Sequence, residues 1–264
     1  MQRLLQQKLY TVASLLHQPS KKISNSNEWL LDFTASDITL YRLKSQIGYR
    51  CAIALQLARQ QGLSSLSIAE QLLSGLITVC PDFTILVEES GWIEFRPSDR
   101  ALAIWLQQIS QQINFQRKEL LKEIVPNFFN LQYTHARCCS LLRLGHREGI
   151  IQLNETLQWK QPYPIPWLDK DNKFRLIHPA EIYLIGEIME VIDVLDREKV
   201  DWIKLTNQFS EAVLECDRDC QFLGEVKRNY PELSQAKLGL YAIAQLLLQK
   251  LLEEKIKVWA PVEL

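Results

Sequence analysis

Residues 127–149 constrain the fold of this chain more than any other stretch. Read at 100° per residue, their apolar and small side chains fall on one stripe of a helix, with His135 at its edge. A stripe of this kind predicts a helix that is buried along one face. Its members are Leu131, Thr134, Cys138, Leu141 and Leu142.

A second stripe of the same predicted helix carries polar and aromatic groups. Asn130, Tyr133, Arg137 and Leu144 spread over about 60° of the helix surface. An amide, an aromatic ring and a planar guanidinium on one exposed stripe suit a nucleobase or a phosphate. The same composition also fits an ordinary surface or a secondary contact face, and spacing alone does not separate the two.

The rest of the C-terminal part is also predicted to be helical. Apolar residues recur at helical spacing over 179–196, 200–216 and 234–254. The last of these segments is apolar on nearly every side, which predicts the central helix of a bundle.

Residues 150–179 form a long connection in which prolines alternate with aromatic residues. A loop of this length inside a compact domain is usually functional or a packed insertion. Trp159, Tyr163 and Trp167 are therefore the candidate residues for binding a protein partner. The alternative is that these rings fold back and cover the bundle.

The N-terminal part mixes helices with a hairpin, an α+β layout. Two β-like runs joined by Glu89, Ser90 and Gly91 predict the hairpin. The predicted helices cover 1–18, 40–61, 65–76 and a segment from Ser98 or Asp99 to about 113, whereas 24–28 is a polar loop and 29–39 fits a strand.

The predicted fold class is therefore mainly α. A small α+β domain covers 1–115, a linker covers 116–126, and an all-helical bundle covers 127–264.

Charge is unevenly distributed, although the net charge is only −1. Residues 111–178 hold ten Lys and Arg against six Asp and Glu, whereas residues 179–220 hold four against eleven. A nucleic acid would therefore meet the first helix of the bundle and its loop, while the acidic segment would repel RNA or attract a basic protein.

The string LQYTHARCCSLLRLG resembles the "YVQYAHARxxSxLR" helix that opens the anticodon-binding domain of arginyl-tRNA synthetases. The string LGEVKRNYPELSQAKLGLYAIAQLLLQKLLEEKIKVWAPVEL is similar to the end of that domain, known as the DALR type. The resemblance covers roughly residues 120–264. Near the N-terminus, YRCAIALQLARQQGLSSLSIAEQLL and SGWIEFRPSDRAL resemble, more weakly, the tRNA-corner domain of the same synthetases.

The resemblance implies RNA-facing positions along the chain. Tyr133 and Arg137 match the helix residues that contact the anticodon loop, Asn130 stands where the family usually has a further aromatic, and Leu264 stands where it usually has Met. The aromatic pair of the family motif "FNRFYxxC" is absent from 209–213, and Glu94 replaces an Asn of the corner domain. The candidate RNA-binding residues are Asn130, Tyr133, Arg137, Arg143 and Leu264.

The catalytic domain that lies between these two domains in the synthetases has no counterpart here. Neither the "HIGH" nor the "KMSK" signature is present, and no Gly-rich phosphate loop follows a strand. The sequence therefore predicts a chain without an ATP site, a catalytic residue or a cofactor. Cys216 and Cys220 lack a second ligand pair nearby in sequence, so no metal site is expected.

No apolar run reaches the length of a membrane helix, and the six cysteines fit reduced thiols in the cytoplasm. Two functions stay open for such a chain. One is the binding of tRNA or another structured RNA, and the other is docking onto a protein complex with the tRNA-binding fold. A third alternative is complementation of a separate catalytic subunit.

Overall fold

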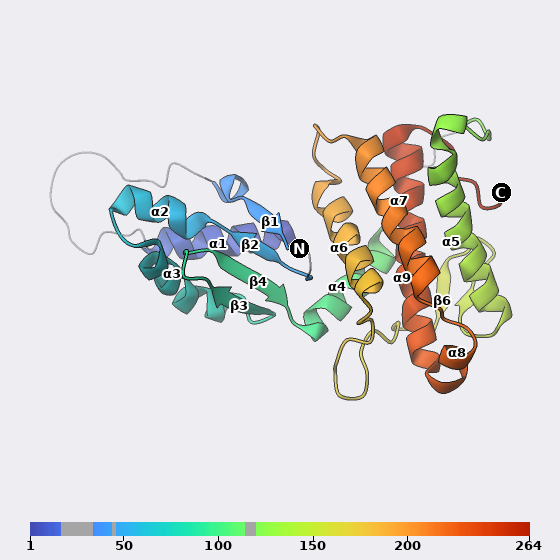
Figure 1. Cartoon of the computed structure of the whole chain (residues 1–264), viewed down its shortest axis with the longest axis horizontal. Coiled ribbons are helices and arrows are strands. Elements are labelled where there is room, and N and C mark those ends of the chain that lie inside the picture. Colours follow the sequence, from blue (N-terminus) through green and yellow to red (C-terminus); the bar gives the residue numbers. More distant parts are fainter. Residues whose placement is uncertain (17–33, 44–45, 114–119) are drawn as a thin grey trace. The chain divides into compact units, whose positions relative to one another are not determined.

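The structure is a computed structural model that describes residues 1–16, 34–43, 46–113 and 120–264 (Figure 1). It confirms the predicted fold class, because the chain is mainly helical with a small antiparallel sheet in its N-terminal part. The chain divides into two compact units, Met1–Ala101 and Leu102–Leu264. The loop expected at 24–28 and the first residues of the possible strand at 29–39 lie outside the described residues.

In its described residues, the first unit combines a four-stranded antiparallel sheet with three helices. The strand order is β1-β2-β4-β3, and side chains of the sheet such as Tyr49, Ile93 and Phe95 are buried. The elements are α1 (Gln2–Leu16), the 3-10 turn η1 (Ala35–Asp37), β1 (Leu40–Arg42), β2 (Tyr49–Cys51), α2 (Ile53–Gln61), α3 (Ser65–Val79), β3 (Phe83–Val87) and β4 (Ile93–Pro97).

The helix predicted over 40–61 is wrong in its first half, where the structure has the β1–β2 hairpin. Burial alternates there with the period of a strand, since Tyr49 and Cys51 are buried and Arg50 between them is exposed. Gly48 supports the hairpin, because a Cβ at this position would lie 2.4 Å from the carbonyl oxygen of Phe95 on β4. The helical spacing of the sequence belongs to α2, which begins only at Ile53.

The β3–β4 hairpin and the helices predicted to begin at residue 65 and at Ser98 or Asp99 are confirmed, whereas the described part of the possible strand at 29–39 contains the 3-10 turn η1 instead. Strands β3 and β4 pair as the expected hairpin, with Gly91 at φ +90° in the turn. The next helix, α4 (Asp99–Gln112), begins after Ser98, whose Oγ accepts a hydrogen bond from the backbone N–H of Ala101. Helix α2 ends at Gly62, which adopts the left-handed conformation that glycine tolerates best.

The second unit is a helical bundle organised around α9. This helix contacts α5, α6, α7 and α8, and most of its side chains are buried, as its all-round apolar sequence predicts (Figure 1). The elements are η2 (Pro126–Phe128), α5 (Phe129–Arg147), β5 (Gln152–Leu153), β6 (Trp159–Gln161), α6 (Pro179–Val194), α7 (Trp202–Asp219), α8 (Glu225–Asn229), α9 (Pro231–Lys250) and the π-helical turn η3 (Leu251–Ile256).

The division between the units falls after Ala101, whereas the sequence places the end of the first domain at residue 115. From Leu102 onward, helix α4 belongs to the second unit, because it contacts the segment that follows β6. Gln107 Oε1 accepts a hydrogen bond from the backbone N–H of Ile165 at 2.9 Å. Sequence periodicity identifies α4 but does not indicate on which unit it packs.

The connection expected over 150–179 is largely a packed insertion. It contains the short β5–β6 hairpin, and its side chains at Ile165, Trp167 and Leu176 are buried. Gly239 allows this close packing, since a Cβ there would lie 2.8 Å from atoms of both Ile165 and Trp167. Within the described part of the chain, no helix is long and apolar enough to cross a membrane.

Candidate functional site

Helix α5 presents the two stripes that its sequence predicts. Its apolar stripe is buried, with exposed fractions from 0 to 3 %. His135 at the edge of that stripe is also buried, at 1 % exposure. The solvent exposure of the polar stripe decreases along the helix: Asn130 and Tyr133 are exposed, whereas Arg137 is half-buried.

An aromatic pair lies at the beginning of α5. Phe129 is 47 % exposed and Tyr133 is 43 % exposed, and their ring centroids are 6.3 Å apart with an angle of 21° between the ring planes. The two residues are spaced i, i+4, so the helix places them on one side. Sequence reasoning missed Phe129, although this spacing was the available signal. Asn130, the second residue of α5, lies in the same helical turn and is exposed.

The helical end that carries this pair is held by a small apolar cluster. Phe128 packs, together with Val125, against the buried Leu131 and Leu252. The backbone N–H of Val125 also donates to Gln132 Oε1 at 2.9 Å. These contacts hold the start of α5, and with it the exposed rings, in one position, which lowers the entropic cost of binding a flat ligand.

Arg137 is engaged within the bundle. Its Nε donates to Asp217 Oδ2 at 2.7 Å and its Nη2 donates to Asp217 Oδ1 at 3.2 Å. The hydrogen bond to Asp217 raises the pKa of the guanidinium above its ordinary value. The separation of basic and acidic surfaces expected from the sequence therefore does not hold at Arg137, because Asp217 comes from the acidic segment.

Residues 258–262 lie along α5 and are held by its side chains. Gln132 Nε2 donates to the carbonyl oxygens of Glu123 and Trp259, both at 2.9 Å. His135 Nδ1 lies 2.8 Å from the carbonyl oxygen of Pro261, and Gln245 Nε2 lies 2.9 Å from His135 Nε2. A carbonyl only accepts, so Nδ1 carries the proton and Nε2 accepts from Gln245. Burial lowers the pKa of His135 to about 4, which keeps the ring neutral.

Arg143 and Leu264 form a second group, separate from the aromatic pair. Arg143 Nη2 donates to the carbonyl oxygen of Val262 at 2.9 Å, and its Nη1 lies 3.6 Å from Glu263. Leu264 follows directly and is 56 % exposed. Since Tyr133 and Arg143 are ten residues apart on one helix, about 15 Å of axial rise separates the two groups.

The three aromatic candidates for partner binding have different surroundings. Trp159 is half-buried and donates from Nε1 to the carbonyl oxygen of Pro162 at 2.8 Å. Tyr163 is 69 % exposed, and its hydroxyl accepts a hydrogen bond from Gln111 Nε2. Trp167 is buried at 2 % exposure and belongs to the core, so its ring is not an exposed anchor for a partner.

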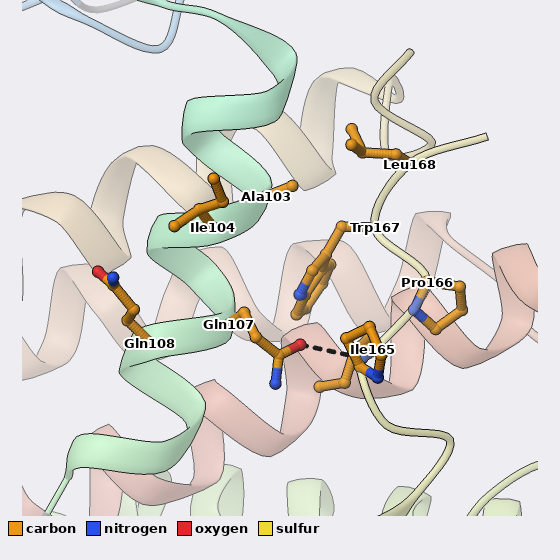
Figure 2. A pocket seen from close by; sticks show the side chains of 9 residues that line it. Ala103, Ile104, Gln107, Gln108, Ile165, Pro166, Trp167 and Leu168 are labelled. Atoms are coloured by element: carbon orange, nitrogen blue, oxygen red, sulfur yellow. Dashed lines mark hydrogen bonds between the residues drawn. The ribbon is translucent and has the colours of Figure 1, made fainter. Parts of the chain in front are cut away.

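A pocket lies between α4 and residues 164–168 (Figure 2). Its volume is about 390 Å³, within the range of small-molecule sites, and none of its lining side chains is charged. Trp167 Nε1, in its wall, has no hydrogen-bond partner among the described residues. The pocket is lined by Ala103, Ile104, Gln107, Gln108, Pro164, Ile165, Pro166, Trp167 and Leu168.

The part of the chain that the structure describes contains no cluster of three or more His, Cys, Asp or Glu side chains that could hold a metal ion. His17 lies outside these residues. Cys216 and Cys220 lie one helical turn apart at the end of α7.

Comparisons with known proteins leave the family open. No protein family, no curated protein and no solved structure matches the chain. The likeness to arginyl-tRNA synthetases therefore rests on the sequence strings quoted above.

Proposed function

We propose that this chain is a non-catalytic, arginyl-tRNA synthetase-like protein that binds tRNA or another structured RNA through the first turns of α5. The exposed, nearly parallel rings of Phe129 and Tyr133 carry the proposal. Unstacked bases of an RNA loop bind such rings, and each base stacked on an aromatic side chain contributes about 1–3 kcal/mol.

The surroundings of the rings suit a single-stranded loop. The side-chain amide of Asn130 offers a donor and an acceptor to the edge of a base. Lys122 is exposed in the segment that precedes α5, and Gln132 holds this segment by a hydrogen bond to Glu123. The ammonium group of Lys122 can therefore approach a phosphate. A double-stranded RNA would be a poorer ligand, because its bases are already stacked on one another.

Arg137 has a smaller role in this proposal than the sequence resemblance implies. A phosphate would have to compete with Asp217, which already accepts two hydrogen bonds from the guanidinium. Binding is therefore expected to depend more on Phe129 and Tyr133 than on Arg137.

The proposal is tested by crosslinking the protein to RNA in cells and sequencing the bound RNA. We expect enrichment of tRNA or of RNAs with structured loops, and a steep loss of this enrichment in high-salt washes. The Phe129→Ala, Tyr133→Ala double variant should lose the enrichment. The matched control is Tyr230→Ala, which removes another exposed tyrosine ring, 63 % exposed, outside α5.

A specific observation favours docking onto a protein as the second candidate. The apolar pocket beside α4 includes Ile104, which is 48 % exposed (Figure 2). Protein partners that survive RNase and high salt, and that are lost in Ile104→Lys but not in the Phe129 and Tyr133 variant, would favour this function. A separate catalytic subunit among those partners would indicate complementation of a synthetase.

A further inference from the structure

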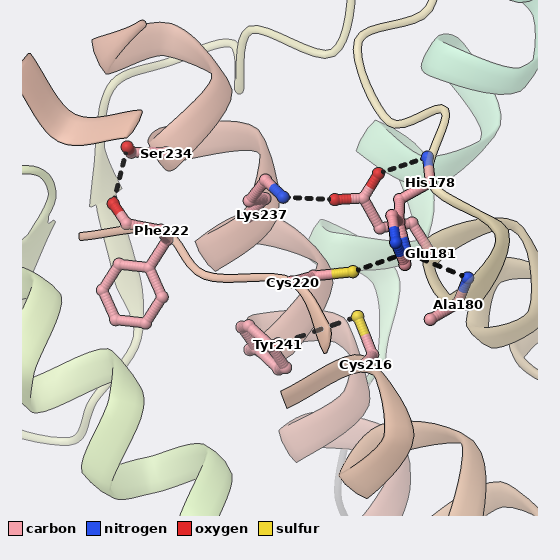
Figure 3. A network of polar contacts seen from close by, with 9 residues as sticks. All are labelled: His178, Ala180, Glu181, Cys216, Cys220, Phe222, Ser234, Lys237 and Tyr241. Atoms are coloured by element: carbon pink, nitrogen blue, oxygen red, sulfur yellow. Dashed lines mark hydrogen bonds and ion pairs between the residues drawn. The ribbon is translucent and has the colours of Figure 1, made fainter. Parts of the chain in front are cut away.

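The six cysteines of this chain are buried free thiols with different surroundings. Burial raises the pKa of Cys51 to about 11, raises that of Cys139 to about 12, and also raises those of Cys80 and Cys138. Cys220 differs, because it follows the last residue of α7 and lies beside the imidazole of His178 (Figure 3).

The imidazole of His178 is placed to accept the proton of Cys220. The Sγ–Nδ1 distance is 3.2 Å. His178 Nδ1 also accepts a hydrogen bond from the backbone N–H of Ala180 at 3.3 Å, so this nitrogen carries a lone pair and the thiol is the donor. His178 is exposed, whereas Cys220 is 3 % exposed directly behind it.

A buried ion pair fixes the position of His178. Glu181 Oε2 accepts the backbone N–H of His178 at 3.0 Å, and Glu181 Oε1 pairs with Lys237 Nζ of α9 at 2.7 Å (Figure 3). The side chains of Glu181 and Lys237 are only 2 % and 11 % exposed. The imidazole therefore lies at the N-terminus of α6, and the ion pair links this end of α6 to α9, the central helix of the bundle.

Cys216 is the natural partner of Cys220. The backbone N–H of Cys220 donates to the carbonyl oxygen of Cys216 at 2.9 Å, so the two residues are joined by one helical turn. Four residues of helix rise about 6 Å, which lies within the Cα–Cα range of about 4.4–6.8 Å that disulfides span. A hydrogen bond from Cys216 lowers the pKa of Cys220 and raises that of Cys216, so the two thiols have different reactivities.

We propose that Cys220 and Cys216 form an oxidisable dithiol in which Cys220 attacks a small hydroperoxide, His178 accepts the thiol proton and Cys216 resolves the product. The thiolate of Cys220 attacks one peroxide oxygen and the O–O bond breaks. Cys220 becomes a sulfenic acid, while the leaving oxygen takes the proton from His178 and departs as water or an alcohol. Cys216 then attacks the Cys220 sulfur, a disulfide forms and water leaves. The two thiols lose two electrons, which reduce the hydroperoxide.

The chain contains its own control for this chemistry. Cys139 Sγ also lies near an imidazole, 3.9 Å from His135 Nε2. Both nitrogens of His135 are engaged, by Pro261 and Gln245, and the ring is buried, so it does not accept a thiol proton. Proximity to histidine alone therefore predicts two reactive thiols, whereas the proposed geometry predicts only Cys220.

The experiment treats the reduced full-length chain with iodoacetamide at neutral pH and measures the alkylation of each cysteine by peptide mass spectrometry. Cys220 should react at least about tenfold faster than the other five thiols, because a larger fraction of it is thiolate. His178→Asn should slow Cys220 by about tenfold, because Asn keeps a helix-capping acceptor but removes the base. Circular dichroism establishes that this variant is folded.

The second arm treats the chain with hydrogen peroxide. Trypsin cleaves after Arg218, between the two cysteines, so a disulfide appears as peptide 205–218 linked to peptide 219–227. In Cys216→Ser the sulfenic acid of Cys220 should persist and be trapped by dimedone. Equal alkylation of all six thiols, an unchanged rate in folded His178→Asn, or peroxide disulfides only between other cysteines or between chains would overturn the proposal.

Discussion

Arg137 donates two hydrogen bonds to Asp217, which lies 80 residues further along the chain on α7. The side chains of the pair are 40 % and 19 % exposed, so solvent screens it and it contributes at most about 1 kcal/mol to folding. Its main effect is on the surface charge of α5, because the carboxylate neutralises the guanidinium on the stripe that we propose as the RNA-binding face.

Asp217→Asn should therefore strengthen RNA binding. The guanidinium of Arg137 would be released to contact a phosphate, and the slope of log affinity against log salt should steepen by about 0.7 for a single-stranded ligand. Fluorescence anisotropy with a labelled RNA hairpin measures both quantities. Glu211→Gln removes a negative charge from an exposed position of the same helix and is the matched control. Equal gains in the two variants would show that only net charge matters.

Gln132→Ala should destabilise the bundle. The side chain is fully buried and bonds the backbones of Glu123, Val125 and Trp259. Its loss leaves buried donors and acceptors unpaired, and each such group costs roughly 1–3 kcal/mol, so we expect a loss of about 2–4 kcal/mol in the free energy of unfolding. Urea denaturation measures this change. Gln208→Ala, at an exposed position of α7, should change stability by less than about 0.5 kcal/mol.

Stability should fall as the pH is lowered from about 6.5 toward 4. His135 has a pKa of about 4 in the folded protein, against an ordinary value of 6.5, because it is buried. The unfolded chain therefore binds a proton in this range that the folded chain does not, and the contribution reaches about 3 kcal/mol at its limit. Urea denaturation at several pH values tests this. His135→Gln should be less stable at pH 7 and show a weaker pH dependence, whereas an equal pH dependence would contradict the role of His135.

Local sequence patterns predicted much of the fold. Stripes at helical spacing identified α1, α5 and α9, and the turn around Gly91 identified the β3–β4 hairpin. The helical spacing was misleading over 40–51, because the strands β1 and β2 lie there. Helix α2 begins two residues after β2, so the spacing of the strands runs directly into the spacing of the helix. The close approach of Gly48 to Phe95, which fixes the hairpin, joins residues that are distant in sequence.

The candidate site was less predictable than the helix that carries it. The buried and exposed stripes of α5 follow from spacing, and so does the exposure of Asn130 and Tyr133. The pairing of Arg137 with Asp217 has no local signal, since 80 residues separate the two. The same is true of Gln132, whose position on a buried face indicates that a polar partner exists but does not identify Trp259.

RNA binding by the rings at the start of α5 is best measured with the purified chain and a labelled RNA hairpin that has a single-stranded loop. Anisotropy titrations compare the wild type, the Phe129→Ala, Tyr133→Ala double variant and Tyr230→Ala. We expect the wild type and Tyr230→Ala to bind alike, and the double variant to lose at least about tenfold in affinity, because each lost stacking contact costs about 1–3 kcal/mol. Equal affinity of the double variant and the wild type, or no binding by the wild type at moderate salt, would contradict the proposed function.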